Sequence, residues 1–351
     1  MKLNRNNPLY IQDLENILQT KNVGLLKDKS ILITGATGLL GVCLIDALMR
    51  MNERGGNVMV YAVGRNKERA YERLGIYFEK PLFQFIEQDA QEELSSQLSV
   101  NYIIPAASNT HPLAYSQYPI ETMFVNLKGA EHALNKACDC GATVLYPSTV
   151  EVYGNARGED VFTEDYTGQL NLFTSRACYT ESKRACEALC QSYIAEKGVN
   201  VKIVRLSRVF GPTMLENDSK ASSQFIKNAL RGEDIVLKSK GEQFFSYTYV
   251  ADAVSAMLYV LLNGDCGVPY NVSNHGCDVH LKEFAAYCAE ACGSQVVFDL
   301  PSETEMKGFS IAQQAILDNA RLMSIGWNPM YDIHDAVRRT IQILQSDNKK
   351  N

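Results

Sequence analysis

The feature that most constrains the fold is a short apolar run that leads directly into a glycine-rich turn. Ile31-Leu-Ile-Thr34 is followed by Gly35-Ala-Thr-Gly38-Leu-Leu-Gly41, and a helical pattern over 42–51 begins at once. Glycine lets the chain turn sharply and lets a phosphate approach the main chain, while the helix N-terminus offers free N–H groups. Strand, turn and helix in this order predict a site for a dinucleotide cofactor.

The same alternation of apolar runs and amphipathic stretches continues along the chain and predicts a parallel sheet. Each further apolar run is followed by loop or helix signals, as in βαβ units. We expect an α/β fold, a doubly wound parallel sheet (Rossmann fold) with a smaller α/β substrate-binding domain. The expected strands after the first are Val58 to Val63, Phe83 to Ile86, Tyr102 to Pro105, Thr143 to Tyr146 and Val201 to Leu206.

Changes in this regularity suggest a division of the chain. Residues 1–29 precede the first strand and carry a helical apolar face, which predicts a packed helical extension, with an oligomer contact as the alternative. Residues 30–205 form the expected dinucleotide-binding domain, to which 247–272 return. Residues 206–246 and 273–345 form the expected substrate-binding domain. The apolar face of the extension consists of Ile11, Leu14, Ile17 and Leu18.

Composition excludes several classes of protein. A formal net charge of -6 without basic runs argues against a nucleic-acid partner. The apolar run 256–262 is too short to cross a membrane, and the first residues lack the apolar core of a signal peptide, so we expect a cytoplasmic protein. The 10 cysteines are expected to be free thiols. Cys138 and Cys140 lack a second ligand pair, and no metal site is predicted.

Two residues bear on which nicotinamide cofactor is bound. The second strand runs into Gly64-Arg65-Asn66 without the carboxylate that often bonds the adenosine ribose. Arg65 can pair with the 2'-phosphate of NADP, stack on adenine, or be an exposed loop arginine. Asp89 follows the third strand and can accept a bond from the adenine amino group or be a solvated turn residue. The cofactor is therefore NAD or NADP.

A tyrosine and a lysine four residues apart are candidates for proton transfer. On a helix, Tyr179 and Lys183 share one face and can meet the same bound cofactor. A nearby ammonium and a positive nicotinamide favour the phenolate, which makes the tyrosine a usable base. Chance also places such pairs on many helices. Thr149, which follows the strand predicted at 143–146, supplies a hydroxyl at the same edge of the sheet.

In their order along the chain, these motifs resemble the extended short-chain dehydrogenase/reductase family of sugar-nucleotide epimerases, dehydratases and decarboxylases. The resemblance covers about residues 29–345 and includes Ala106-Ala107-Ser108, Asn126 and the segment from Arg205 to Pro212. It implies that Thr149 bonds the sugar C4 hydroxyl, that Tyr179 takes its proton and that Lys183 holds the nicotinamide ribose. It also favours NAD over NADP and implies a homodimer and a nucleotide-sugar substrate.

The motifs and the resemblance together give two sets of site residues. The expected cofactor-binding residues are Gly35, Thr37, Gly38, Leu39, Leu40, Gly41, Arg65, Asp89, Ala90, Ala106, Ala107, Ser108, Asn126, Tyr179, Lys183 and Leu206. The expected substrate-binding residues are Asn109, Thr110, Thr149, Glu151, Arg208, Ser223 and Gln224. The expected catalytic residues are Thr149, Glu151, Tyr179 and Lys183.

Four positions bear on the reaction. Glu151 stands where similar dehydratases and decarboxylases, but not simple epimerases, have an acid, and the segment 176–187 is most similar to UDP-glucuronate decarboxylases. Against this, Val150 replaces a second acid of the dTDP-glucose dehydratases. Phe245 stands where the decarboxylases have an arginine, and Arg208 replaces the family's asparagine.

The resemblance therefore implies an enzyme that modifies a nucleotide sugar through a 4-keto intermediate, of the decarboxylase or 4,6-dehydratase type. A 4-epimerase is the first alternative. An NADPH-dependent sugar-nucleotide reductase and a cofactor-binding regulator without turnover are alternatives of other classes. Arg65 favours the reductase, whereas the intact set of Thr149, Tyr179 and Lys183 argues against the regulator.

Overall fold

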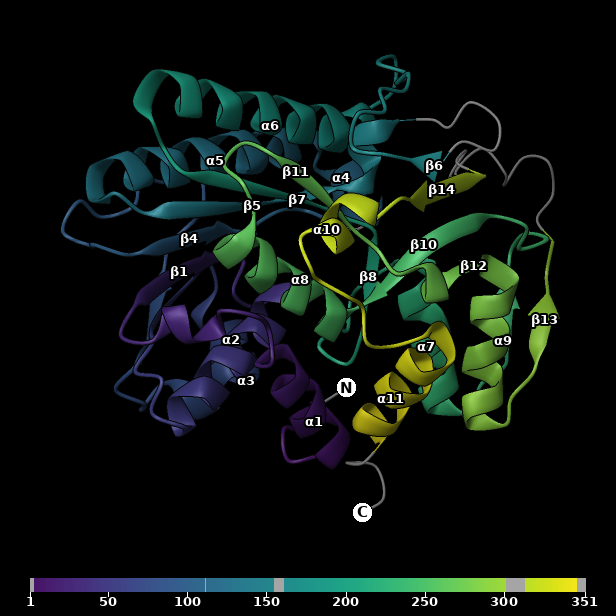
Figure 1. The fold of residues 1–351 in the computed structure, drawn as a ribbon. Coiled ribbons are helices and arrows are strands. Elements are labelled where there is room, and N and C mark those ends of the chain that lie inside the picture. The colour runs from purple at the N-terminus through teal and green to yellow at the C-terminus, as the bar shows by residue number, and fades with distance from the viewer. Residues whose placement is uncertain (1–2, 111, 155–160, 301–312, 346–351) are drawn as a thin grey trace.

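A seven-stranded parallel sheet forms the centre of the molecule, with the strand order β11-β7-β5-β4-β1-β2-β3 (Figure 1). The computed structural model describes residues 3–110, 112–154, 161–300 and 313–345. The predicted fold class is confirmed, and the expected strands occur within a few residues of their predicted bounds. The strands are β1 (Ser30–Thr34), β2 (Met59–Gly64), β3 (Phe83–Glu87), β4 (Tyr102–Pro105), β5 (Thr143–Thr149), β7 (Val201–Leu206) and β11 (Pro269–Val272).

Helices cover both faces of this sheet (Figure 1). On one face lie α5 (Pro119–Cys140) and α6 (Ala177–Lys197), and on the other lie α2 (Leu39–Glu53) and α8 (Val250–Asn263). The apolar strand residues alternate between two cores, as the period of a strand requires. Ile33 belongs to the core beneath α2 and α8, whereas Leu32 belongs to the core beneath α5 and α6.

A second, smaller sheet lies beside the first and is built mainly from later parts of the chain. Its strands follow the order β12-β10-β14-β6, and β8 pairs with β10. The helices α7 (Ala221–Arg231), α9 (Leu281–Cys292) and α11 (Ile333–Gln345) pack against one another beside it. The strands are β6 (Val161–Phe162), β8 (Arg208–Phe210), β10 (Phe244–Tyr249), β12 (Asp278–His280) and β14 (Gln314–Leu317), and a separate pair is formed by β9 (Ile235–Leu237) and β13 (Val296–Phe298).

The N-terminal segment packs on the large sheet's helices through α1 (Pro8–Ile17), which contacts α2, α8 and α11. The Asp46 carboxylate of α2 is buried and accepts bonds from Arg5 Nε at 2.9 Å, Tyr10 Oη at 2.6 Å and Tyr77 Oη at 2.9 Å. Three donors compensate the desolvation of this buried charge. The segment is therefore held by both apolar and polar contacts.

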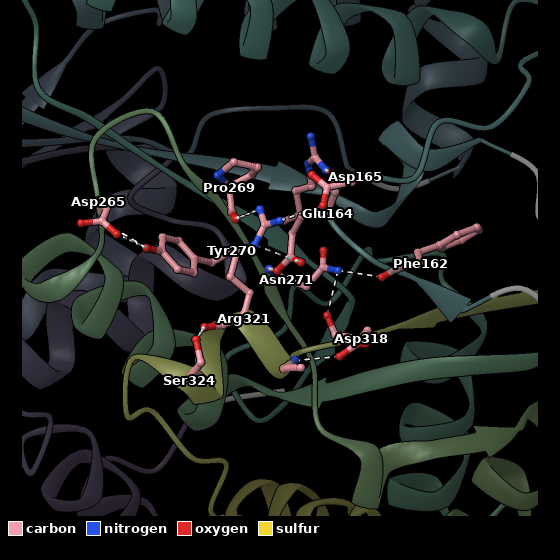
Figure 2. Close-up of polar contacts among 12 residues, drawn as sticks. Phe162, Glu164, Asp165, Asp265, Pro269, Tyr270, Asn271, Asp318, Arg321 and Ser324 are labelled. Atoms are coloured by element: carbon pink, nitrogen blue, oxygen red, sulfur yellow. Dashed lines mark hydrogen bonds and ion pairs between the residues drawn. The ribbon is translucent and has the colours of Figure 1, made fainter.

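A polar cluster joins residues of β11, at the edge of the large sheet, to residues that follow β6 and β14 of the small sheet, as Figure 2 shows. Asn271 of β11 donates from Nδ2 to the Phe162 carbonyl at 2.8 Å and to the Asp318 carbonyl at 2.9 Å. The buried Glu164 accepts the Asn271 backbone N–H at 2.9 Å, and Arg321 donates to Asp165 at 3.1 Å. These bonds fix β6 and the following residues against the edge strand of the large sheet.

Candidate functional site

A cavity of about 730 Å³ opens at the carboxyl ends of the strands of the large sheet, where β1 and β4 lie side by side. From β1 the chain proceeds outward to β2 and β3, and it then crosses back to β4 on the other side of β1. Such a reversal leaves a crevice in which doubly wound folds bind their ligands. The volume is within the range of pockets for drug-sized molecules and cofactors.

The glycine turn shapes the floor of the cavity. Gly35 has φ +67°, and a Cβ added there would lie 2.7 Å from the Ala106 carbonyl carbon. A Cβ on Gly41 would lie 2.6 Å from the Gly35 carbonyl oxygen. Gly38 is the N-cap of α2 and has no side chain to bond the first N–H groups of the helix. The turn is therefore a cradle that only glycine can form, with a helix N-terminus beside it.

Two buried polar atoms, both on residues that the sequence assigned to the cofactor, have no hydrogen-bond partner among the described residues. They are Ser108 Oγ, whose residue lines the cavity, and Asn126 Oδ1. Asn126 is fixed by a bond from its Nδ2 to Ser182 Oγ at 2.8 Å, so its carbonyl oxygen is held in place. A buried polar atom without a partner is costly unless a ligand supplies one. Together with the glycine cradle, these atoms fit a nicotinamide dinucleotide.

At the end of β2, Arg65 is held by carboxylates rather than free. Its Nη1 donates to Glu121 of α5 at 2.5 Å and lies 4.0 Å from Asp89, and all three residues line the cavity. The bond to Glu121 is the main reason that the pKa of Arg65 is raised. The Asp89 carboxylate also accepts the Gln91 backbone N–H at 2.9 Å, as a turn aspartate does. Glu121 of α5 thus provides a carboxylate near the end of β2, where the sequence of that strand provides none.

Thr149 and Tyr179 meet at the other end of the cavity. Thr149 is the last residue of β5, Tyr179 lies in the first turn of α6, and both line the cavity. Burial raises the pKa of Tyr179 above its ordinary value, a hydrogen bond with the Thr149 side chain lowers it, and the Glu151 charge raises it. The net direction is upward, so the phenol is protonated at neutral pH in the protein alone.

Lys183 lies one helical turn after Tyr179 and is buried below the cavity. Its Nζ donates to the Pro147 carbonyl at 2.9 Å and lies 4.9 Å from the centre of the Tyr146 ring. Burial lowers the pKa of this lysine, while the charges of Cys186 and Glu187 raise it. The sequence assigned the activation of Tyr179 to Lys183, and the structure adds Thr149 as a direct partner of the phenol.

Glu151 lies on the turn η3 (Val150–Tyr153) that follows β5, and it lines the cavity. Its backbone N–H donates to Thr149 Oγ1 at 3.3 Å, which fixes the turn relative to the threonine. Its charge raises the pKa of both Tyr179 and Tyr115. The carboxylate therefore acts on the same region as the phenol.

Sequence reasoning missed Tyr115, which stacks on Tyr179 with ring centres 5.6 Å apart. Its hydroxyl accepts a bond from Arg176 Nη2 at 3.3 Å, and burial is the first reason that its pKa is raised to about 12. No motif surrounds Tyr115 in the sequence, because the stack joins two distant segments. Only an expectation that α4 (Pro112–Gln117) lies over α6 could have indicated it.

The cavity brings together most of the residues that the sequence predicted. Asn126, Lys183, Ser223 and Gln224 are not among those that line it. Asn126, Lys183 and Ser223 are buried, and Gln224 donates to the Asp218 carbonyl at 2.8 Å. Asn217, Asp218 and Lys220, just before α7, line it instead. The predicted residues that line it are Gly35, Thr37, Gly38, Leu39, Leu40, Gly41, Arg65, Asp89, Ala90, Ala106, Ala107, Ser108, Asn109, Thr110, Thr149, Glu151, Tyr179, Leu206 and Arg208.

Two further kinds of site were sought in the part of the chain that the structure describes. No described helix is both long and apolar enough to span a membrane. Among the same residues, no group of three or more His, Cys, Asp or Glu side chains is arranged to hold a metal ion.

Comparison with known sequences gives a consistent assignment. Residues 31–274 match the model of the NAD dependent epimerase/dehydratase family. A UDP-glucuronic acid decarboxylase 1 of Xenopus tropicalis is 31% identical over 319 residues, which cover 91% of this chain and 73% of the relative. UDP-glucuronic acid decarboxylase 6 of Arabidopsis thaliana is 34% identical over 248 residues, which cover 70% of this chain and 69% of the relative.

Solved structures share the fold. A dTDP-glucose 4,6-dehydratase of Streptomyces venezuelae with NAD bound aligns with a TM-score of 0.76 at 20% identity, over 91% of this chain and 98% of that chain. A UDP-glucuronic acid 4-epimerase of Bacillus cereus, in complex with UDP-glucuronic acid and NAD, aligns with a TM-score of 0.76 at 18% identity, over 90% of this chain and 99% of that chain.

Proposed function

Because the chain belongs to the NAD-dependent epimerase/dehydratase family, we propose that it decarboxylates a nucleotide-linked uronic acid through a 4-keto sugar. The observation that carries this choice is the position of Glu151, which lines the same cavity as Tyr179 and Thr149 and whose backbone N–H bonds Thr149 Oγ1 at 3.3 Å. The sequence relatives, which are UDP-glucuronic acid decarboxylases, support uridine diphosphate as the nucleotide part of the substrate and glucuronate as its sugar.

The cofactor is NAD in this proposal, with NADP as the alternative that Arg65 leaves open. A bound nicotinamide supplies a hydride acceptor for C4 and returns that hydride later. The glycine cradle and the N-terminus of α2 hold the diphosphate, and Ser108 and Asn126 offer their unpartnered oxygens. Lys183 holds the nicotinamide ribose once it is released from the Pro147 carbonyl.

Proton transfer at the sugar C4 hydroxyl falls to two residues. Thr149 Oγ1 bonds this hydroxyl and orients it, and Tyr179 Oη accepts its proton as the C4–H bond is broken. The raised pKa of Tyr179 means that the phenolate needs further positive charge nearby, which Lys183 supplies after it moves toward the ribose. The product of this half is a ketone at C4.

The ketone makes the next bond cleavage favourable. The bond between C5 and its carboxylate breaks, carbon dioxide leaves, and the electron pair passes into the C4 carbonyl as an enolate. Tyr179, now protonated, stabilises that oxygen, and a proton then returns to C5. Glu151 lies beside the carboxylate that leaves, and its negative charge destabilises that carboxylate more than the neutral carbon dioxide that it becomes, while the charge passes to the enolate oxygen held by Tyr179.

The alternatives are less well supported. Elimination of a 6-hydroxyl is helped in dTDP-glucose dehydratases by an acid at the place that Val150 occupies here. A simple 4-epimerase, a net reductase or a regulator has no need for the acid at Glu151. Decarboxylation uses both the acid and the Thr149, Tyr179 and Lys183 set.

Mass spectrometry of products after incubation with NAD and a panel of nucleotide sugars tests the proposal. UDP-glucuronic acid is expected to give a UDP-pentose and carbon dioxide, and the Tyr179→Phe variant is the control. A product of unchanged mass would indicate an epimerase, and loss of water from a nucleotide hexose would indicate a dehydratase. Either result would overturn decarboxylation.

We also propose which parts of the chain bind the cofactor and the substrate, and that two copies of the chain form a homodimer. Residues 30–205 with 247–272 bind the cofactor, and 206–246 with 273–345 bind the nucleotide side of the substrate. The exposed apolar side chains of Ile120 and Phe124 on α5 support a homodimer. We propose that this dimer is cytoplasmic. Sedimentation analysis that found only monomers would refute the dimer.

A further inference from the structure

Arg208 lines the cavity, and its side chain lacks a hydrogen-bond acceptor among the described residues for one of its nitrogens. It is the first residue of β8 and follows Leu206, the last residue of β7, and Ser207, which also line the cavity. Its guanidinium carbon lies 3.6 Å from the centre of the Phe245 ring on the neighbouring strand β10. Its Nη1 is buried and bonds no atom of the described residues. The stacked ring fixes the plane of the guanidinium but satisfies none of its N–H groups.

A buried cationic donor without an acceptor is unfavourable in the protein alone. Burying a charged N–H group without a new acceptor costs more free energy than burying a neutral polar group without a partner. Native proteins keep such a group when a ligand supplies the acceptor. A carboxylate or phosphate matches the planar fork of an arginine better than a neutral hydroxyl does.

The Arg208 charge lies in the same cavity as Tyr179, the residue proposed to contact the reacting sugar. The positive charge of Arg208 lowers the pKa of Tyr115, and Tyr115 stacks on Tyr179. Glu151 acts on Tyr115 with the opposite sign. An anionic group held between Arg208 and the Tyr179 hydroxyl would therefore lie close to C4 of a bound sugar.

Arg208 and Phe245 both depart from the pattern of the similar decarboxylases, and the structure places them in contact. The resemblance implies an arginine where this chain has Phe245 and an asparagine where it has Arg208. Relative to that pattern, the chain lacks one positive charge and carries another. In the structure these side chains are in contact across two paired strands. The Arg208 guanidinium on β8 thus lies against the side chain at the position of β10 where the resemblance implies an arginine.

We propose that Arg208 forms an anion-binding subsite that holds carboxylate or phosphate oxygens of the substrate, and so selects it. The subsite rests on the proposed function. The acceptor is either the sugar carboxylate or the diphosphate, since both present paired anionic oxygens to the fork.

Calorimetric titration of the NAD-loaded protein distinguishes the two sources. The probes are UDP, UDP-glucose and UDP-glucuronic acid, and a Tyr179→Phe background prevents turnover. Arg208→Gln is compared with Arg208→Lys, which keeps the charge. Arg231→Gln is the matched control, because Arg231 is an exposed arginine of α7 that does not line the cavity.

Arg208→Gln is expected to weaken binding about ten- to hundred-fold, as loss of a charge-assisted bond does. If the carboxylate is the partner, only UDP-glucuronic acid loses affinity. If the diphosphate is the partner, all three probes lose affinity equally. In both cases Arg208→Lys retains part of the affinity, Arg231→Gln retains all of it, and the melting temperature of the ligand-free Arg208→Gln protein is unchanged or higher.

Unchanged affinity for all three probes in Arg208→Gln would overturn the subsite. So would a lower melting temperature of the ligand-free variant with no selective loss of binding, because that pattern describes a structural arginine. A selective loss of binding in a protein that leaves UDP-glucuronic acid unreacted when Tyr179 is intact would refute the decarboxylase and retain the subsite. Failure of all three probes to bind the protein with Arg208 intact would refute both.

Discussion

At the scale of single residues, the site depends on groups whose ionisation is set by their neighbours. Burial keeps Tyr179 protonated, Thr149 lowers its pKa, and Glu151 opposes ionisation. A base with a raised pKa is more often protonated at neutral pH, so its proton-accepting form increases as the pH rises. In the proposed mechanism the balance is adjusted by the charges that arrive with the ligands and by the ammonium of Lys183.

Tyr179→Phe is expected to lower turnover by about 10²- to 10⁴-fold and to leave the fold intact, because only a hydroxyl is removed. Wild-type turnover is expected to rise with pH through the neutral range, and the residual activity of the variant to lose that dependence. Steady-state rates across pH and circular dichroism check both. A variant with near-normal turnover would remove Tyr179 from its role.

The ion pair of Arg65 with Glu121 bears on the choice of cofactor. A 2'-phosphate would have to displace the Glu121 carboxylate and approach Asp89, whereas ribose hydroxyls can donate to Glu121. Glu121→Gln is therefore expected to shift the ratio of NADP to NAD affinity by about ten-fold toward NADP, or ~1.4 kcal/mol. Glu131→Gln, also on α5 but outside the cavity, is the control.

Fluorescence titration of both oxidised cofactors into the cofactor-free proteins measures this ratio. An unchanged ratio in Glu121→Gln would show that the ion pair has no part in selection. Strong NADP preference in the wild type would show that the 2'-phosphate displaces the acid without difficulty, and Arg65 would then be its receptor.

At the scale of elements, the β1 turn combines two constraints at one residue. Gly35→Ala places a Cβ 2.7 Å from the Ala106 backbone at φ +67°, whereas Gly232→Ala at φ +68° meets nothing within 4 Å. The first variant is expected to lose about 1–3 kcal/mol more in free energy of unfolding, and to lose cofactor binding. Urea denaturation and cofactor titration measure both. Equal losses in the two variants would show that only the strain of positive φ matters.

The first turn of α8 contains a buried acid that should make stability depend on pH. The Asp252 carboxylate accepts the backbone N–H groups of Met330 at 2.8 Å and Tyr331 at 3.3 Å, yet burial, the first cause, raises its pKa to about 7. Since the folded pKa exceeds the unfolded value of about 3.9, this group stabilises the fold at acid pH. That contribution is lost as the pH rises through about 4 to 7.

Asp252→Asn removes this titration while keeping an acceptor oxygen. The wild type is expected to lose stability relative to the variant between acid and neutral pH, by up to ~1.4 kcal/mol for each unit of the pKa shift. Urea unfolding of both proteins at several pH values in this range measures the difference. Parallel curves would contradict the raised pKa.

At the scale of the whole molecule, prediction succeeded where the determinants are local in sequence. The strand, glycine turn and helix at 31–51, and the place of Tyr179 and Lys183 on one helix, were predictable because each fits within one element or one turn. The catalytic roles of the two residues stay a prediction. Contacts between distant segments were not predictable in this way. The Tyr115 stack, the Glu121 ion pair and the Arg208 contact with Phe245 each need the tertiary arrangement, since no periodicity connects their members.

The central claim is that oxidation at C4 precedes loss of the carboxylate. The most direct measurement mixes the NAD-loaded protein with UDP-glucuronic acid carrying a ¹³C carboxylate, in a single turnover. Absorbance of the reduced nicotinamide is followed together with release of labelled carbon dioxide. The account predicts that the absorbance rises first and falls as the UDP-pentose forms. Release of carbon dioxide without a preceding rise in absorbance, or no release at all, would contradict it.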